Sequence, residues 1–344
     1  MIIGKLDLGP QPVLLAPMED VTDASFRLIC KEQGADLVYT EFISSDGLIR
    51  DAKKALSKMV TSEAEAPIGI QIYGADPEAM EDAARMADRA AEIAGGHGAD
   101  LIDINFGCPV SKIAGRGAGS GMMKEPDKMV AITRAIVEAV GKPVTVKTRL
   151  GWDEQSKIIV ELAERLQDVG IAALTIHGRT RCQMYKGEAD WSLIGAVKAN
   201  PRMHIPIIGN GDISTAAKAR EAFERYGVDG VMVGRASFGH PWIFREIKHL
   251  LATGEELPPL SVPERVALAK RHFALSLAVK GPVTGVYEMR RHLSCYFKGL
   301  PDFKETRIRL VTSTDPDEIY ALLDHIADRW GSVDLPSQTG VYGL

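Results

Sequence analysis

Short apolar segments recur along the first 235 residues of the chain. Most are continuous runs of apolar and β-branched residues rather than alternating patterns, which is typical of strands buried on both faces of a parallel sheet. We expect eight such strands, at residues 13–18, 37–43, 67–73, 101–106, 143–150, 173–178, 205–210 and 230–235.

Segments with helical periodicity separate these strands. Residues 76–94 begin with Asp76 as the predicted N-cap and Pro77 at the first helical position. Residues 125–141 and 214–227 repeat the amphipathic helical pattern. The regular alternation of eight strands with helices predicts an α/β fold, a closed (β/α)8 TIM barrel. A doubly wound open sheet is the structural alternative.

The pattern changes after residue 255. A proline-rich joint, GEELPPLSVPERV, is followed by segments that look helical at residues 262–280, 283–300 and 315–330, with no further strand of the barrel type. We therefore expect two domains, a barrel over residues 1–255 and a small all-α helical domain over residues 256–344.

Composition excludes several classes of protein. Hydrophobic residues make up 45% and charged residues 25% of the 344 residues, an ordinary balance for a globular enzyme. No apolar run approaches the roughly 20 residues that cross a bilayer, and the N-terminus lacks the features of a secretory signal. The four cysteines form no CxxC pair and the eight histidines no ligand-spaced cluster. We therefore expect a cytoplasmic protein with no membrane association and no metal.

Polar, small or backbone-exposing residues follow most of the predicted strands. Because barrels of this kind carry their reactive groups at the carboxyl ends of the strands, we expect these residues to meet around one site. They are Ala16, Pro17, Met18, Gln71, Asn105, Gly107, Cys108, Lys147, Arg149, His177, Arg179, Asn210, Gly211, Asp212, Gly234 and Arg235. The last two strand ends predict a phosphate site, since glycines permit close backbone approach and Arg235 supplies a planar cation.

Cys108 is the predicted reactive group. It stands between Gly107 and Pro109 just after a strand, so its thiol should project over the barrel mouth as a nucleophile or proton donor. The glycine-rich segment that follows, with glycines over residues 115–121, lacks the G-x-G-x-x-G spacing and is interpreted as a mobile, basic loop. Cys30, by contrast, is expected in the core.

The run IDINFGCPVSKI (102–113) followed by AGRGAGS (114–120) resembles the signature of the tRNA-dihydrouridine synthases. Further segments resemble that family in the same order: LAPMEDVTDASFR (15–27), QIYG (71–74), VTVKTRLGWD (144–153), TIHGRTRCQMYKGEADW (175–191), NGDI (210–213) and GRASFGHPWIF (234–244). The resemblance covers residues 11–330 and points to the bacterial subfamily in which a helical C-terminal domain directly follows the barrel.

The resemblance implies that FMN lies over the barrel mouth. The residues that match its binding site are Ala16, Pro17, Met18, Gln71, Asn105, Lys147, His177, Asn210, Gly211, Asp212, Gly234 and Arg235. Lys147 matches the lysine at the pyrimidine edge of the flavin, and Asn105 a position near both flavin and uracil. Arg179, Arg181 and Tyr185 match a loop that faces the target uridine and its tRNA.

The same resemblance implies the reaction. NADPH or NADH would reduce the flavin, hydride would pass to carbon 6 of a uridine in tRNA, and the thiol of Cys108 would protonate carbon 5 to give 5,6-dihydrouridine. A thiol with a pKa of about 8.5 is largely protonated at neutral pH and suits this role. The target base would have to leave its stack to reach the site.

The net charge of −5 counts weakly against a nucleic-acid partner, but the distribution of charge favours one. Residues 264–309 hold ten Lys or Arg against four acidic residues, with Tyr287, Tyr296 and Phe297 interleaved. This is the composition of an RNA-binding face. We therefore expect the helical domain to bind tRNA and the protein to be a monomer.

Three other functions fit part of the sequence. The first is an FMN barrel that reduces a free pyrimidine, against which the basic C-terminal region and the HGRTR segment (177–181) count. The second is a noncatalytic RNA-binding protein on a barrel scaffold, against which Cys108 and the flavin set count. The third is a metal-free aldolase or isomerase, in which Lys147 would form a Schiff base.

Overall fold

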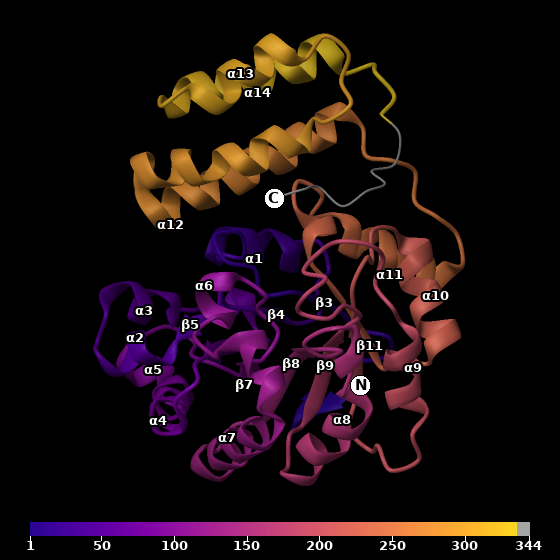
Figure 1. The fold of residues 1–344 in the computed structure, drawn as a ribbon. Helices are drawn as coiled ribbons and strands as arrows, with labels where there is room; N and C mark the ends of the chain where they lie inside the picture. The colour runs from indigo at the N-terminus through magenta and orange to yellow at the C-terminus, as the bar shows by residue number, and fades with distance from the viewer. Residues whose placement is uncertain (336–344) are drawn as a thin grey trace.

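The computed structural model describes residues 1–335, and its first part is a ring of parallel strands (Figure 1). In chain order the strands of the ring are β3 (Val13–Leu15), β4 (Val38–Tyr39) with β5 (Ile43–Ser44), β6 (Ile68–Tyr73), β7 (Leu101–Asn105), β8 (Val144–Arg149), β9 (Ala173–His177), β10 (Ile207–Asn210) and β11 (Gly230–Val233). From β6 to β11 each strand pairs with the next in sequence, β4 and β5 both pair with β6, and β11 pairs with β3. A parallel bridge between Leu14 and Leu37 closes the ring. The predicted eight-stranded barrel is thus confirmed, and the open-sheet alternative is wrong.

A small antiparallel hairpin precedes the barrel and was not predicted. It consists of β1 (Ile2–Ile3) and β2 (Leu6–Asp7). Ile3 is fully buried in a cluster with Leu14, Leu37 and other residues from the amino-terminal parts of the strands. The hairpin therefore covers the end of the barrel opposite the carboxyl ends of the strands.

Helices surround the ring as expected from their amphipathic patterns. They are α1 (Ala24–Glu32), α2 (Ser45–Ile49), α3 (Lys53–Lys58), α4 (Pro77–Asp88), α5 (Ala90–Ile93), α6 (Ser111–Ala114), α7 (Pro126–Ala139), α8 (Ile159–Asp168), α9 (Ser192–Ala199), α10 (Ala216–Tyr226) and α11 (Ile243–Thr253), with 3-10 turns η1 (Glu63–Glu65), η2 (Gly119–Lys124), η3 (Glu154–Ser156) and η4 (Arg235–Ser237). The Asp76 side chain caps α4 by accepting from the Ala79 N–H at 2.9 Å, as predicted. Gly227 ends α10 in the left-handed conformation.

A second, all-helical layer lies above the barrel in Figure 1. Its first element, α12 (Val262–Tyr296), is two helices joined at Gly281, whose φ of 76° is non-helical. The two halves pack against each other, since the Ser276 hydroxyl donates to the Gly285 carbonyl at 3.1 Å. The result is an αα-hairpin that matches the helices predicted at 262–280 and 283–300. The last helix, α14 (Pro316–Trp330), was also predicted.

One helix of this layer, α13 (Lys304–Thr312), was missed. Its sequence, KETRIRLVT, buries only Thr306 and Leu310, so it lacks the apolar stripe by which an isolated helix is recognised. Residues 336–344, the end of the predicted helical domain, lie outside the described part of the chain.

The helical layer has a hydrophobic core of its own, with Phe273, Leu293, Tyr296, Phe297 and Trp330 among its members. Because Tyr296 and Phe297 are fully buried there, the prediction that they belong to an RNA-binding face is wrong. Of the three interleaved aromatic residues, Tyr287 alone is exposed.

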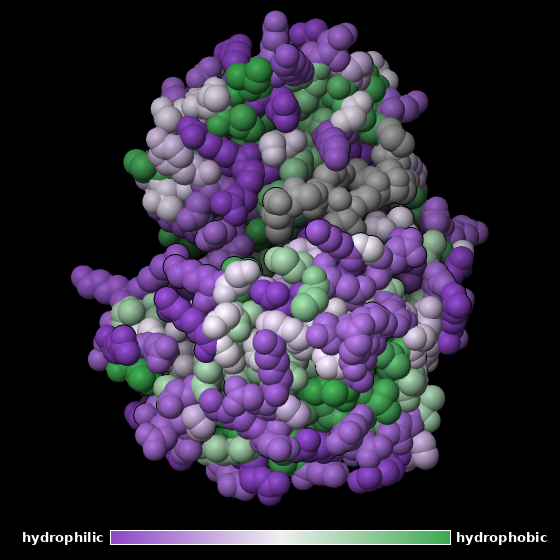
Figure 2. Space-filling model, in the orientation of Figure 1, coloured by the Kyte–Doolittle hydropathy of each residue, from purple (hydrophilic) through white to green (hydrophobic). Residues whose placement is uncertain are grey.

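Hydrophilic residues cover most of the face of the molecule shown in Figure 2. Within residues 1–335, no helix has the length and apolar character needed to span a membrane.

Candidate active site

A cavity of about 320 Å³ opens at the carboxyl ends of the barrel strands. Most of the predicted site residues line it: Ala16, Pro17, Met18, Asn105, Cys108, Lys147, His177, Tyr185, Asn210, Gly211, Asp212, Gly234 and Arg235. They come from the ends of β3, β7, β8, β9, β10 and β11 and from the loop after β9. The chain thus brings together residues that are as many as 219 positions apart, from Ala16 to Arg235. Gln71, Arg179 and Arg181 are not among the lining residues.

Gln71 lies beneath the cavity in a buried chain of hydrogen bonds. Its side-chain amide donates to Asp103 Oδ2 at 2.6 Å, and its carbonyl oxygen accepts from the Asn105 amide at 2.9 Å. Thr145 donates to the other oxygen of Asp103 at 2.5 Å. Burial raises the pKa of Asp103 to about 6 despite these donors. The structure therefore gives Gln71 the position of a residue that orients Asn105 from below.

Asn105 in turn holds the backbone around Cys108. Its side-chain oxygen accepts from the Gly107 and Cys108 N–H groups, at 3.0 and 2.9 Å. On the other side, the Cys108 carbonyl accepts from both the N–H and the hydroxyl of Ser120, at 3.0 and 2.7 Å. Cys108 is therefore fixed from two directions with its side chain on the cavity.

The surroundings of Cys108 favour the protonated thiol at neutral pH. Burial raises the pKa of this thiol above its ordinary value, although the nearby cations Arg149 and Lys147 act in the opposite direction. A buried neutral thiol is a poor nucleophile and an available proton donor. Cys30, the comparison cysteine, is fully buried in the barrel core, as predicted.

The glycine-rich segment connects two short helical elements that the sequence did not predict, α6 and η2. Of these, η2 packs against the Cys108 backbone through Gly119 and Ser120. Gly119 has a φ of +54°, and a Cβ there would lie 3.0 Å from the Cys108 carbonyl oxygen. A Cβ on Gly121 would lie 2.4 Å from the Ala114 carbonyl oxygen. The glycines therefore permit close packing beside Cys108.

Three cations line the cavity: Lys147, Arg149 and Arg235. Burial, with a smaller effect of Arg149, lowers the pKa of Lys147 to about 8, so that its ammonium remains mostly charged at neutral pH. Its Nζ lies 3.3 Å from Asn210 Oδ1. His177 adds no charge, because burial and the surrounding cations hold its pKa well below the ordinary value.

Arg149 belongs to the strand-end residues that the sequence groups around one site, but the sequence gave it no binding or catalytic role. It is almost fully buried and donates through Nε to the Gly107 carbonyl at 2.7 Å, and through Nη1 to the Thr180 and Met184 carbonyls at 3.0 and 2.9 Å. It thus joins the backbone beside Cys108 to the loop that carries Tyr185. The signal was present, since Lys147 and Arg149 are two residues apart in β8 and therefore share a face.

Arg179 is engaged inside the protein rather than free at the mouth. It forms a bidentate ion pair with Asp212, at 2.9 and 2.8 Å, and donates to the Lys186 carbonyl at 3.2 Å. Burial alone would raise the pKa of Asp212, but Arg179 and the Ala189 N–H hold it below its ordinary value. The pair fixes the end of β10 beside Gly211, whose φ is +124°.

Tyr185 and Arg181 belong to the same loop but differ in exposure to the cavity. The Tyr185 ring lies 4.6 Å from the Arg235 guanidinium carbon and 5.7 Å from that of Arg149. Arg181 lies instead against the Trp152 ring at 4.8 Å, with Lys124 over that ring at 3.7 Å. Arg181 therefore joins the loops that follow β8 and β9 outside the cavity.

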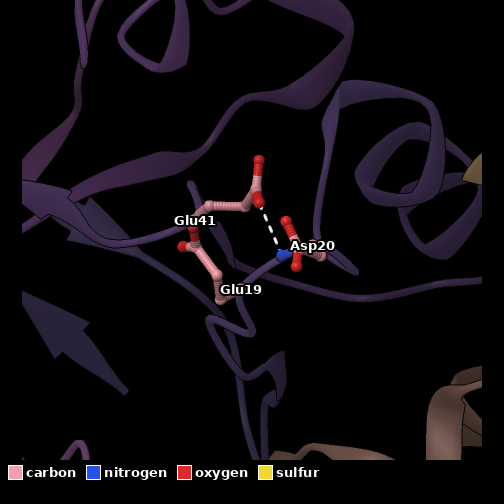
Figure 3. A group of neighbouring side chains, drawn as sticks. All are labelled: Glu19, Asp20 and Glu41. Carbon is pink, nitrogen blue, oxygen red and sulfur yellow. Dashed lines mark hydrogen bonds between the residues drawn. The ribbon is translucent and has the colours of Figure 1, made fainter. Parts of the chain in front are cut away.

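Three carboxylates lie close together, as Figure 3 shows, and that of Glu19 belongs to a residue that lines the cavity. Glu19, Asp20 and Glu41 bring oxygen atoms within 4.8 Å of one another. Lys58 already supplies the counter-charge, because its Nζ lies 2.7 Å from Glu19 and 3.7 Å from Glu41. The Asp20 N–H also donates to Glu41 at 2.7 Å. The cluster is thus a structural ion-pair network, and we assign no metal to it.

Several of the cations of residues 264–309 form ion pairs within the protein. Lys270 pairs with Asp324, Arg271 with Glu32, Lys280 with Asp23 and Glu288, and Arg309 with Glu318. Arg265 is buried and stacks on Trp242. The surplus of positive charge seen in the sequence is therefore smaller on the surface than its count suggests.

Comparison with known proteins agrees with this geometry. The dihydrouridine synthase family model matches residues 14–330. A probable tRNA-dihydrouridine synthase of Rickettsia conorii is 40% identical over 96% of this chain and 96% of its own. The tRNA-dihydrouridine synthase B of Xanthomonas axonopodis pv. citri is 41% identical over 94% of both chains.

Solved structures support the fold alone. A 2-naphthoyl-CoA reductase complex aligns with a TM-score of 0.54 at 12% identity, over 72% of this chain and 51% of its own. A morphinone reductase variant in complex with tetrahydroNAD aligns with a TM-score of 0.50 at 13% identity, over 72% and 88%.

The site is that of an oxidoreductase barrel with a protonated thiol among cations. The chain belongs to the dihydrouridine synthase family, as its sequence resemblance predicted.

Proposed function

We propose that this enzyme reduces specific uridines in tRNA to 5,6-dihydrouridine, with FMN as its cofactor and NADPH or NADH as the source of electrons. The observation that carries the proposal is the placement of Cys108, whose pKa is raised by burial, in a cavity with three cations, in a chain of this family. The names of the relatives support tRNA as the substrate.

The donor set of the cavity fits FMN. Among its acidic lining residues, Glu19 is paired with Lys58, and Asp212 is shared by Arg179 and Arg235. Lys147 and Arg149 add further positive charge, and the resulting surplus suits an anionic group. Arg235, Gly234 and Gly211 would hold the phosphate, and Ala16 to Met18 with Lys147 and Asn210 would face the ring. When bound, FMN supplies the hydride that adds to carbon 6 of the uracil.

The residues of the chain supply the rest of the chemistry. Cys108 would give its proton to carbon 5, on which negative charge would otherwise develop, and Lys147 would remain a cation near that charge. The backbone hydrogen bonds from Asn105 and Ser120 would hold the thiol in place. Since the cavity lies inside the barrel mouth, the base must be extruded from its stack to enter.

Other chemistry fits less well. A Schiff base would need a neutral Lys147 amine, whereas a pKa of about 8 keeps it mostly protonated at neutral pH. Reduction of a free pyrimidine would give no role to the basic helical domain, which we propose contacts tRNA.

The experiment is direct. Purified protein with FMN and NADPH is incubated with unmodified tRNA transcript, and nucleosides are analysed by mass spectrometry for uridines that have gained two hydrogens. Free uracil and uridine are tested in parallel. Dihydrouridine at defined positions supports the proposal. Equal turnover of free uridine and tRNA would favour the free-pyrimidine reductase, and a protein that retains no flavin would contradict both.

A further inference from the structure

The second half of the α12 hairpin carries an exposed aromatic residue, Tyr287, which is not part of the hydrophobic core. Tyr287 is 52% exposed, and Val283, four residues earlier on the same helical face, is 68% exposed. Val279, just before the turn at Gly281, is 50% exposed. Single exposed apolar residues need no explanation, but three at one hairpin tip form a small apolar patch.

The inner face of Tyr287 rests on a fixed cation. The guanidinium carbon of Arg290 lies 4.3 Å from the centre of the Tyr287 ring. Arg290 Nη2 donates to the Thr312 and Ser313 carbonyls, at 3.0 and 3.1 Å, at the end of α13. Because those carbonyls hold the guanidinium, the ring is supported by a fixed cation while about half of the residue, 52%, stays exposed to solvent.

The hairpin tip is joined to the rim of the active-site cavity. Arg291, four residues after Tyr287 and so on the same face of the helix, donates to the Asp20 carbonyl at 3.0 Å. Lys280 pairs with Asp23 at the start of α1. Asp20 follows Met18 and Glu19, which line the cavity. The hairpin that carries the patch is therefore anchored to the loop after β3, whose residues Met18 and Glu19 line the cavity.

We infer that Tyr287, supported by Arg290, is a stacking platform for an unpaired base of the tRNA substrate. An open aromatic face backed by a guanidinium suits any nucleobase, since every base presents a π-face. The neighbouring cations Arg290 and Arg291 suit the flanking phosphates. The inference rests on the proposed function and names a contact outside the catalytic cavity: a base held here would anchor the RNA while a different nucleotide enters the barrel.

The test compares four full-length holoenzymes: wild type, Tyr287→Phe, Tyr287→Leu and Ile308→Ala. The leucine keeps apolar cover but removes the ring. Ile308 is the matched control, an exposed apolar residue on α13 of the same layer. Affinity for fluorescently labelled, unmodified tRNA transcript is measured by anisotropy over a salt series, alongside tRNA-dependent and NADPH-dependent flavin turnover.

Loss of a base stack should weaken the tRNA affinity of Tyr287→Leu by roughly 5- to 100-fold. The slope of log affinity against log salt should not change, because no phosphate contact is removed. Tyr287→Phe and Ile308→Ala should remain close to wild type, and reduction of the flavin by NADPH should be the same in all four proteins.

Two results would overturn the inference. One is wild-type affinity in Tyr287→Leu, and the other is a change in oligomeric state by light scattering, which would mean that the patch contacts a second copy of the chain. Failure of the proposed function looks different: the wild type itself would then neither bind the transcript nor form dihydrouridine.

Discussion

The barrel mouth and the junction between barrel and helical hairpin both bury charged groups, yet they balance them differently. At the junction, Lys280 is shared by the carboxylates of Asp23 and Glu288, and Arg271 pairs with Glu32. At the mouth, the carboxylate of Asp212 is shared by Arg179 and Arg235, while Lys147 and Arg149 add two further cations to the lining of the cavity. Because buried charge is costly unless it is paired, this excess of positive charge suits an anionic ligand.

The two regions also use histidine differently. Burial is the largest cause of the lowered pKa of His177 at the mouth, and the cations Arg149, Lys147, Arg179 and Arg235 lower it further. At the junction, His272 and His292 are neutral mainly because they are buried among rings, with Phe26 at 5.5 and 4.7 Å from their centroids. The mouth is therefore arranged for a ligand and the junction for packing.

The largest effect is expected at the mouth from Cys108→Ala. The variant should bind FMN and accept electrons from NADPH at a near-normal rate, because that half-reaction needs no thiol. Reoxidation by tRNA should slow by about 100- to 10,000-fold, the usual loss for a general acid. Rapid-mixing absorbance measures the two half-reactions separately.

Cys30→Ala is the control for this prediction, since that thiol is buried in the barrel core. It should lower thermal stability without selective loss of the tRNA half-reaction. If the two variants slow tRNA-driven reoxidation equally, or if Cys108→Ala slows neither half-reaction, Cys108 is not the proton donor.

The excess charge at the mouth is tested by Arg235→Ala. Loss of a hydrogen bond to a charged group costs about 1.5–3 kcal/mol, so FMN affinity should fall by roughly 10- to 100-fold. Arg225→Ala is a matched control, because Arg225 also lies over a tyrosine ring, that of Tyr226 at 5.2 Å, but on the outer helix α10. Unchanged FMN retention in Arg235→Ala, measured by fluorescence titration, would remove its phosphate role.

At the junction, stability should fall as the pH is lowered. Burial lowers the pKa of His272 to about 4, below the value of about 6.5 for an unfolded chain. At a pH between these two pKa values, His272 binds a proton in the unfolded state but not in the folded state. Unfolding therefore becomes more favourable as the pH drops from about 6.5 to 4. For His272 alone the loss approaches about 3 kcal/mol at the low end.

His292→Phe should flatten this pH dependence. The ring packs at a tilt against Phe26 and Phe238, and its Nδ1 has no hydrogen-bond partner among the described residues. Phenylalanine therefore keeps the packing and removes one titrating group. Denaturation followed at several pH values should give a slope lower by up to about 1.4 kcal/mol per pH unit. The exposed His204→Ala serves as control, and an unchanged slope in His292→Phe would contradict the assignment.

The sequence predicted the barrel and most of the cavity because both depend on local signals. Continuous apolar runs locate the strands, and a barrel necessarily places their carboxyl ends together, so Asn105, Lys147 and Arg235 could be grouped without coordinates. What could not be predicted is which polar groups satisfy one another. Arg179 looked available for substrate, but its pairing with Asp212, 33 residues away, appears only in three dimensions.

The helical layer was less predictable for a related reason. Its cations and aromatic residues could be counted, but a count does not say that Tyr296 is core or that Lys270 and Arg309 are paired. The chain gave no apolar stripe for α13. A binding surface on this layer can be predicted only once the packing of its helices is known. A site at the ends of barrel strands can be predicted without that knowledge.

The smallest effect is expected at the edge of the junction, from the Glu32–Arg271 pair. Its atoms are close, at 2.7 Å, but the side chains remain 40% and 54% exposed. Solvent screens such a pair, so a double-mutant cycle with Glu32→Ala and Arg271→Ala should give a coupling energy of only about 0.2–1 kcal/mol, smaller still at high salt. The buried Asp23–Lys280 pair, at 11% and 18% exposure, should couple more strongly in the same assay. Equal coupling energies for the two pairs would mean that burial does not set the strength of this junction, and that the packing of Phe26 against the histidines holds the hairpin on the barrel instead.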